Sequence, residues 1–223
     1  MTDLLVTGTD IGVGKTVVAA ALVLALRQQG IQAVGFKPVE SGVSAGQLPD
    51  SAVLASASAV DAPLARPLLQ LAEALAPAVA AERAGVALDV KALERRLTSL
   101  SAAGFTVVVE GAGGLLVPLA WGYTALDLAA RCGLRAVVVG RPGLGTLNHC
   151  ALTIEALNTR GVPVLGVILN RPSEPPDLAE STNPAALAQL FPGVPVLVLP
   201  RHPTEDPLEA ARRSVPFVSG LLG

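Results

Sequence analysis

Aromatic residues, long hydrophobic runs and net charge are all scarce in this 223-residue sequence. Aromatic residues make up 3% of the chain while hydrophobic residues make up 51%, so a folded core must be filled mainly by Ala, Val and Leu. No apolar run approaches the roughly 20 residues that a membrane-spanning helix needs. The formal net charge of −2 gives no electrostatic basis for binding nucleic acid. We therefore expect neither a membrane nor a nucleic-acid partner.

Cysteine is also nearly absent. Cys132 and Cys150 lack the spacing of metal ligands, and we interpret both as thiols buried in a reducing compartment. The N-terminal residues include Asp3 and no basic segment before an apolar run, which argues against a secretory signal. Both observations predict a cytoplasmic protein.

Lysine is rare among the basic residues. Of the 16 basic residues only Lys15, Lys37 and Lys91 are lysines, and the rest are Arg. Because this chain otherwise uses Arg, a Lys indicates a position that requires a compact ammonium group rather than a planar guanidinium. We expect such a requirement at Lys15 and Lys37, whereas Lys91 lies on an ordinary helix face.

The most informative segment present is residues 8–16, which read GTDIGVGKT between an apolar run and a helix-forming run. Strand, loop and helix in this order are typical of a P-loop, whose backbone N–H groups and helix N-terminus bind phosphates. We expect Lys15 to reach the β- and γ-phosphates and Thr16 to hold Mg²⁺. The spacing is a variant, because Thr9 stands where the first glycine is expected. The predicted nucleotide loop comprises Gly12, Val13, Gly14, Lys15, Thr16 and Val17.

Six apolar segments recur along the chain and are mostly separated by helix-like stretches. They are nearly continuous hydrophobic runs, as expected of parallel strands buried on both faces. This alternation predicts an α/β fold, a doubly wound and mainly parallel sheet, in a single P-loop NTPase-like domain spanning residues 1–223. The predicted strands are 4–6, 33–36, 105–109, 136–139, 164–169 and 194–199.

Capping residues predict where two helices begin. Thr124 and Asp127 have the spacing of a capping box, which places a helix start directly after Thr124. Asn183 followed by Pro184 predicts a second start, because Asn is a favoured cap and Pro suits the first helical position.

Charged residues follow two of the predicted strands, at the edge where a parallel sheet collects ligands. Lys37 could neutralise charge on a transferring phosphoryl group or on an anionic nucleophile. Glu110 stands where an acid that binds Mg²⁺ belongs. Asp50 has two interpretations that the spacing leaves open, a functional carboxylate or a helix N-cap. The small residues after Glu110, which let the backbone approach a nucleotide, are Gly111, Ala112 and Gly113.

Residues 143–148 (GLGTLN) precede a predicted helix of about 149–159 and form a second candidate anion site. This segment has no lysine and is too short for a triphosphate, so a single carboxylate is the fitting ligand. The alternative is that its glycines only let a strand turn into a helix. His149 and His202 have no metal-ligand neighbours, and we expect neither to act as a general base.

Taken together, these segments resemble the dethiobiotin synthetase family over nearly the whole chain. The combination is far more specific than any single motif. The segments that carry the resemblance are 8–16, 37–42 (KPVESG), 110–114 (EGAGG), 145–149 (GTLNH) and 169–171 (LNR).

The resemblance implies an enzyme that makes dethiobiotin from 7,8-diaminononanoate, CO₂ and MgATP in biotin biosynthesis. In the implied reaction one amine captures CO₂ as a carbamate, and the carbamate attacks the γ-phosphate of ATP. The second amine then closes the mixed carbamic–phosphoric anhydride to a cyclic urea, releasing ADP and phosphate. No protein nucleophile is required, in agreement with the absence of a Ser-His or Cys-His arrangement.

The resemblance also implies roles for individual residues. Lys37 and Lys15 are the catalytic lysines, and Thr16, Asp50 and Glu110 hold the metal. Ser41 contacts the diamine. Residues implied to bind the nucleotide around its base are Asn170, Arg171, Pro200, Arg201 and His202. The loop implied to reach the substrate of the partner subunit across a homodimer with shared active sites is Gly145, Thr146, Leu147 and Asn148.

Two departures from the family pattern stand out. Ile11 replaces a Thr common in this P-loop, and the last strand lacks the Gly often found before its end. A partitioning-type P-loop ATPase switch is the alternative function. Such switches carry an additional lysine before the glycines, where this chain has Asp10.

Overall fold

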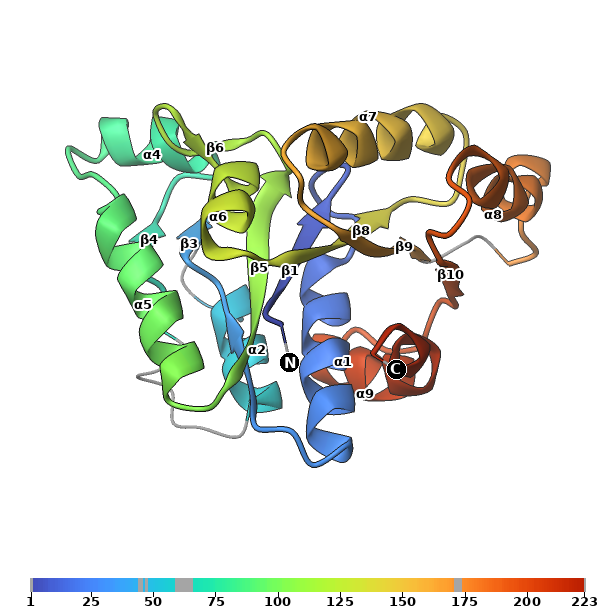
Figure 1. Ribbon diagram of the computed structural model, residues 1–223, viewed down its shortest axis with the longest axis horizontal. Helices are drawn as coiled ribbons and strands as arrows, with labels where there is room; N and C mark the ends of the chain where they lie inside the picture. Colours follow the sequence, from blue (N-terminus) through green and yellow to red (C-terminus); the bar gives the residue numbers. More distant parts are fainter. Residues whose placement is uncertain (1, 44–45, 47, 59–65, 171–173, 223) are drawn as a thin grey trace.

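The computed structural model describes residues 2–43, 46, 48–58, 66–170 and 174–222. Its central sheet has six strands in the order β10-β9-β8-β1-β5-β2, and all neighbouring strands pair in parallel (Figure 1). The predicted doubly wound parallel sheet is therefore confirmed. The strands are β1 (Leu4–Gly8), β2 (Ala33–Phe36), β5 (Thr106–Gly114), β8 (Arg135–Gly140), β9 (Val164–Asn170) and β10 (Val196–Leu199).

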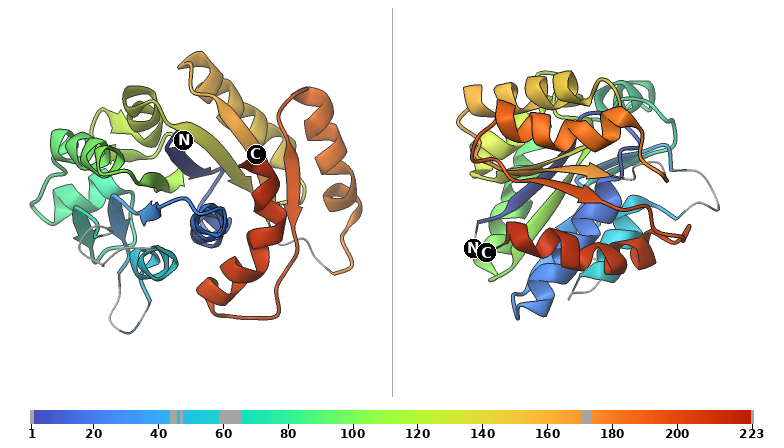
Figure 2. Two further views of the ribbon diagram at one scale, coloured as in Figure 1. Left: turned by 60° about the horizontal axis from the view of Figure 1, so that its bottom comes forward. Right: turned by 90° about the vertical axis from the view of Figure 1, so that its right-hand side faces the viewer.

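Helices cover both faces of this sheet (Figure 2). One face carries α1 (Lys15–Gln28), α2 (Asp50–Ala57) and α9 (Pro207–Val218), and a short 3₁₀ turn, η1 (Ser219–Leu221), follows α9. The other face carries α4 (Pro77–Arg83), α5 (Val90–Ala102), α6 (Ala125–Cys132), α7 (Thr146–Thr159) and α8 (Leu178–Leu190). Within the described part of the chain, none of the helices is long and apolar enough to cross a membrane.

The packing of β1 explains why the strands read as continuous hydrophobic runs. Leu5 packs into the core on the side of α5 and α6, whereas Leu4 and Val6 pack into the core on the side of α1. Alternate side chains of the same strand therefore face two separate cores, and neither face is left to solvent.

Two small pairs of strands flank the central sheet. β3 (Val39–Ser41) pairs in parallel with β4 (Leu69–Leu71), and β6 (Pro118–Ala120) pairs antiparallel with β7 (Tyr123–Thr124). Because β3 follows β2 after only Lys37 and Pro38, it continues the chain along the carboxyl edge of the sheet.

The two helix starts predicted from capping residues have different outcomes. Thr124 and Asp127 form the predicted capping box at the start of α6. The start predicted at Asn183–Pro184 is wrong, because α8 begins at Leu178, where Asp177 and Glu180 form a complete capping box. Pro184 lies inside the helix, and the Asn183 amide instead donates to the carbonyl oxygens of Pro142 and Gly143, at 2.7 and 3.1 Å. A tertiary contact thus occupies the side chain that a local pattern assigned to a cap.

Candidate functional site

The glycine-rich loop lies between β1 and α1, as the sequence predicts. Gly12 and Gly14 adopt left-handed conformations, with φ of 66° and 94°. Lys15 is the first residue of α1, and its buried ammonium donates to the carbonyl oxygen of Asp10 at 3.0 Å. Burial lowers the pKa of Lys15, and the nearby charge of Lys37 lowers it further. Lys15, the N-terminus of α1 and the neighbouring Lys37 therefore face the same space.

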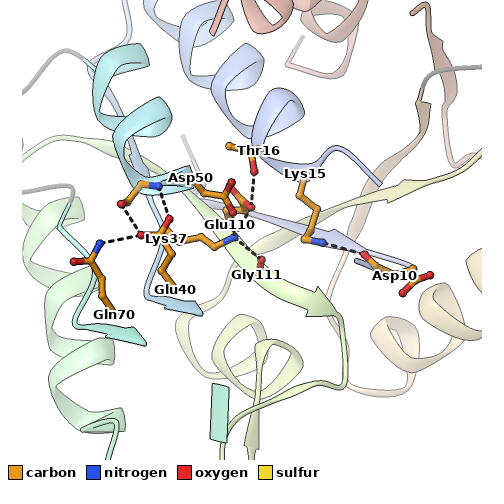
Figure 3. Close-up of polar contacts among 10 residues, drawn as sticks. Asp10, Lys15, Thr16, Lys37, Glu40, Asp50, Gln70, Glu110 and Gly111 are labelled. Atoms are coloured by element: carbon orange, nitrogen blue, oxygen red, sulfur yellow. Dashed lines mark hydrogen bonds and ion pairs between the residues drawn. The ribbon is translucent and has the colours of Figure 1, made fainter. Parts of the chain in front are cut away.

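Lys37 lies directly after β2 and lies between two carboxylates (Figure 3). Its Nζ is 2.5 Å from Oε1 of Glu110 and 2.8 Å from Oδ2 of Asp50. Burial on its own would lower the pKa of Lys37, but the two carboxylates outweigh burial and raise the pKa above its ordinary value. The two carboxylates therefore favour the charged ammonium form of Lys37 at the carboxyl edge of the sheet.

Glu110 comes from β5 and is almost fully buried, with 1% of its surface exposed. Its Oε1 accepts hydrogen bonds from Lys37 and from the hydroxyl of Thr16, the latter at 3.0 Å. Among the described residues, its Oε2 has no hydrogen-bond partner. Burial raises the pKa of Glu110, and the ammonium of Lys37 opposes that shift.

Asp50 opens α2, and its side chain points to Lys37 rather than to its own helix. The N-cap interpretation of Asp50 is wrong, because the cap position is Pro49. Burial favours a higher pKa at Asp50, but the charge and hydrogen bond of Lys37, together with Thr16 and Lys15, outweigh burial and hold the pKa below its ordinary value. Three elements that are distant in sequence thus bring Lys37, Asp50 and Glu110 into one charged cluster.

A cavity of about 400 Å³ opens onto this cluster. Its walls include the P-loop, the charged cluster, Ser41 and the small residues Ala112 and Gly113. A larger cavity of about 800 Å³ lies near Asp3 and Thr106, at the amino-terminal ends of the strands, and contains none of the predicted site residues. The 400 Å³ cavity, with two lysines and oxygen ligands in its walls, has the chemistry needed to bind a nucleotide phosphate group.

The cluster also fits a hard divalent cation. Asp50, Glu110 and Thr16 supply oxygen donors, which Mg²⁺ prefers, and Glu110 Oε2 is buried without a hydrogen-bond partner among the described residues. In the part of the chain that the structure describes, no group of three or more His, Cys, Asp or Glu side chains is placed to hold a metal ion. The protein would therefore supply part of a coordination shell, as is usual for Mg²⁺ bound together with phosphates.

Asn170 ends β9 and contacts the P-loop directly. Its Nδ2 donates to the carbonyl oxygen of Val13 at 2.9 Å. A Cβ on Gly14 would lie 1.8 Å from this same Nδ2 atom, so only glycine allows the approach. Leu199 pairs with Asn170 in the sheet, which places Pro200 at the same edge.

The remaining residues predicted around the nucleotide base have mixed positions. Arg201 is exposed, and the ring of His202 lies 3.0 Å from the Ser214 hydroxyl of α9, in a loop after β10. Arg171 falls outside the described residues.

The predicted carboxylate loop does not line the 400 Å³ cavity. Gly145 is the N-cap of α7 and has a φ of 95°. No side chain accepts a capping hydrogen bond at this helix start. Thr146 is buried and approaches Cys150, whereas Leu144 is 96% exposed and Asn148 is exposed. Within one chain, this loop therefore contributes no residue to the 400 Å³ cavity.

Two residues that sequence reasoning missed contact the site. Glu40 is a buried carboxylate on β3 that binds the first turn of α2, and its only signal was a charge inside the KPVESG segment. Arg141 reaches from the loop after β8 to the P-loop, where it donates to the carbonyl oxygen of Ile11 at 3.2 Å and lies 3.6 Å from Asp10. No local pattern indicates the second contact, because it joins segments 130 residues apart.

A family model and several named proteins match this chain. The family model that matches residues 2–212 describes an AAA domain. An ATP-dependent dethiobiotin synthetase BioD from Anaeromyxobacter dehalogenans (strain 2CP-C) is 48% identical over 204 residues, covering 91% of this chain and 92% of that protein. The protein of the same name from Mycobacterium leprae (strain Br4923) is 45% identical over 194 residues, covering 86% and 84%.

Among solved structures, the septum site-determining protein MinD from Pyrococcus horikoshii, complexed with Mg-ADP, superposes with a TM-score of 0.60. The superposition covers 100% of this chain and 92% of the MinD chain, and the two sequences are 22% identical. At this level of identity the likeness supports the predicted P-loop NTPase-like fold and nothing beyond it.

Proposed function

This chain belongs to the ATP-dependent dethiobiotin synthetases, and from that premise we propose how its own residues carry out the reaction. The enzyme is an ATP-dependent ligase of biotin biosynthesis. We propose that its substrates are 7,8-diaminononanoate, CO₂ and ATP. The observation that carries this proposal is the position of Lys37, which lies beside the P-loop, in the wall of a cavity that also includes Lys15 and Ser41.

The proposed reaction needs positioning and charge stabilisation rather than a protein nucleophile. One amine of the diamine captures CO₂ as a carbamate, whose oxygen attacks the γ-phosphorus as the bond to ADP breaks. The second amine attacks the carbamoyl carbon, phosphate leaves, and the cyclic urea forms. Lys15 binds the phosphates of ATP, while Lys37 stabilises the charge on the carbamate and the transferring phosphoryl group. Ser41, at the end of β3, contacts the diamine.

We propose that Thr16, Asp50 and Glu110 hold Mg²⁺ with the nucleotide. Support comes from their oxygen donors and from the buried Oε2 of Glu110, which has no partner among the described residues. When bound, this ion neutralises negative charge on the β- and γ-phosphates. The residues themselves contribute the fixed positions of the donors, which three different elements provide.

We also propose a homodimer in which the loop of Gly145, Thr146, Leu147 and Asn148 completes the active site of the partner subunit. The support is a surface of exposed apolar side chains near that loop. Leu116 is 60%, Leu144 96% and Leu152 63% exposed, and a cavity of about 430 Å³ lies between Leu116, Leu152 and Thr9 of the P-loop. Exposed apolar side chains gathered in this way are typical of protein interfaces.

The base of ATP is proposed to bind near Asn170 and Pro200, at the edge where β9 and β10 end. A cytoplasmic location and a single synthetase domain over residues 1–223 remain predictions of the sequence. The partitioning-type switch is less well supported. Its additional lysine is replaced by Asp10, whose carboxylate lies near Arg141.

The test is to measure ATP hydrolysis by the purified protein with and without diaminononanoate and bicarbonate. We expect ADP release to depend on both additions and to match dethiobiotin formation one to one. A rate of ATP hydrolysis that does not change with diamine but increases with protein partners would favour the partitioning-type switch.

A further inference from the structure

We propose that Glu40 is a positioning residue, whose buried carboxylate fixes the first turn of α2 and thereby holds Asp50 at the active site. The inference rests on the proposed function, because it takes Asp50 to be a ligand of the metal that binds with ATP. Glu40 itself acts through Asp50 and needs no contact with substrate.

The contacts of Glu40 show how it holds α2 (Figure 3). Glu40 is 3% exposed. Its Oε1 accepts the backbone N–H of Ser51 at 2.9 Å, and its Oε2 accepts the Ser51 hydroxyl at 2.7 Å. Gln70, its partner across the β3–β4 pair, donates to Oε2 at 3.0 Å. Two of these three hydrogen bonds go to the residue that follows Asp50 in the chain.

The first turn of α2 depends on this outside help. The helix has 8 residues, and its N-cap residue, Pro49, makes no capping hydrogen bond from its side chain. A helix this short has little stability of its own, and the N–H groups of its first turn need acceptors. A carboxylate at a helix N-terminus is favourable because it accepts these hydrogen bonds and interacts with the helix dipole.

The same short segment places both partners of the Lys37–Asp50 ion pair. Lys37 directly follows β2, and Glu40 lies three residues further on, in β3. Lys37 contacts the Asp50 carboxylate at 2.8 Å, while Glu40 anchors the backbone one residue further on. Residues 37–40 thus hold Asp50 through two contacts, one to its carboxylate and one to the backbone of the next residue. A change at Glu40 removes the second contact.

A purely structural role would not require a charge at this position. Burying a carboxylate among neutral donors is costly, and an apolar or neutral side chain could fill the same volume. Charge-assisted hydrogen bonds are stronger and more directional than neutral ones, which suits a residue that must hold a neighbour in one place.

The experiment measures Mn²⁺ binding in the presence of ADP by electron paramagnetic resonance, without diamine or turnover. The variants are Glu40→Gln, Glu40→Ala, Asp50→Asn and the double variant Glu40→Ala/Asp50→Asn. Gln70→Ala is the matched control, because it removes a hydrogen bond from Glu40 without touching α2. Thermal unfolding of each variant reports stability separately.

We expect Glu40→Ala to weaken Mn²⁺ binding by roughly tenfold, the usual scale for a residue that orients a metal ligand. Glu40→Gln should give a smaller loss, because its amide oxygen can still accept from Ser51. Gln70→Ala should leave Mn²⁺ affinity unchanged. In the Asp50→Asn background, Glu40→Ala should have no further effect on Mn²⁺ affinity, because the Asp50 carboxylate that Glu40 positions is already absent.

Each contrary result has a distinct meaning. Mn²⁺ affinity unchanged in Glu40→Ala overturns the inference, as does a loss of the same size with and without Asp50. If Glu40→Ala does not fold, Glu40→Gln decides, and normal Mn²⁺ affinity in that variant overturns the inference. Unchanged Mn²⁺ affinity in Asp50→Asn removes Asp50 from the proposed metal site and overturns both proposals. A loss in Asp50→Asn alone overturns the role of Glu40 only.

Discussion

The ammonium of Lys37 lies 2.5 Å from Oε1 of Glu110, while Oε2 of the same carboxylate is buried with no hydrogen-bond partner among the described residues. A buried carboxylate is costly unless a cation accompanies it, so Lys37 supports the fold in addition to its proposed role in the reaction. A variant at Lys37 therefore tests catalysis only if its stability and nucleotide binding are measured beside its turnover.

Replacing Lys37 by Gln should lower kcat much more than it weakens ATP binding. The amide removes the charge that we propose acts on the transferring group, and loss of one such stabiliser typically costs about 100- to 1000-fold in rate. The measurements are steady-state dethiobiotin formation and ATP binding by calorimetry. Lys91→Gln, at an exposed position on α5, is the control and should behave like the wild type. Near-normal product formation by Lys37→Gln would end the catalytic assignment.

The stability of Lys37→Met should depend on pH through Glu110. Burial already raises the pKa of Glu110 above its ordinary value of 4.5, and removing Lys37 should raise it further. A raised pKa means that the fold favours the protonated acid, so stability is highest at low pH and falls as pH rises through the raised value. The deficit of Lys37→Met relative to the wild type should therefore be largest near pH 8 and shrink toward pH 5.

Urea unfolding at several pH values measures this deficit. The double variant Lys37→Met/Glu110→Gln is the control, because it lacks the Glu110 carboxylate, and its stability should fall less from pH 5 to 8 than that of Lys37→Met. Asp50 also loses the charge of Lys37 that holds its pKa below its ordinary value, so both variants are compared again in an Asp50→Asn background. A deficit in Lys37→Met that is constant from pH 5 to 8 would contradict the prediction.

Alanine at Gly14 should destabilise the protein more than alanine at Gly12. Both glycines have positive φ, which costs an ordinary residue about 1 kcal/mol or more. A Cβ at Gly12 meets no atom within 4 Å, whereas a Cβ at Gly14 would lie 1.8 Å from Nδ2 of Asn170. The measurement is the free energy of unfolding in urea. Adding Asn170→Ala to Gly14→Ala should recover part of the loss, and equal losses at the two glycines would argue against the contact.

Much of the fold and part of the site could be predicted from the sequence, because their signals are local. The strand before Lys37 and the strand that carries Glu110 are continuous apolar runs, and a parallel sheet brings their carboxyl ends to one edge. Asp50 was ambiguous, because its partner is Lys37, a residue on another element. Asn183 was misread as a cap for the same reason, since its amide binds the loop at Pro142. Glu40 was missed because its partner Ser51 is 11 residues away, on a different element.

The proposed sharing of active sites between subunits can be tested with two inactive variants. Lys37→Gln damages the phosphate side of a site, and Gly145→Glu places a negative charge at the loop expected to bind the substrate carboxylate. Because Gly145 has a φ of 95°, part of any loss in Gly145→Glu could come from backbone strain. Gly145→Asn is the matched control, since Asn tolerates this conformation and carries no charge, and it should retain activity.

Mixing the two variants separates a shared site from a site built within one chain. If sites are shared, one site of the mixed dimer combines both defects, while the other combines an intact Lys37 with an intact Gly145 loop. The mixed dimer then recovers up to about half of the wild-type activity per dimer, although each parent is inactive. If each site is built within one chain, every subunit carries one defect and the mixture stays inactive. Subunit exchange must be confirmed by separately tagging the two variants, because inactivity after confirmed exchange would rule out the shared site.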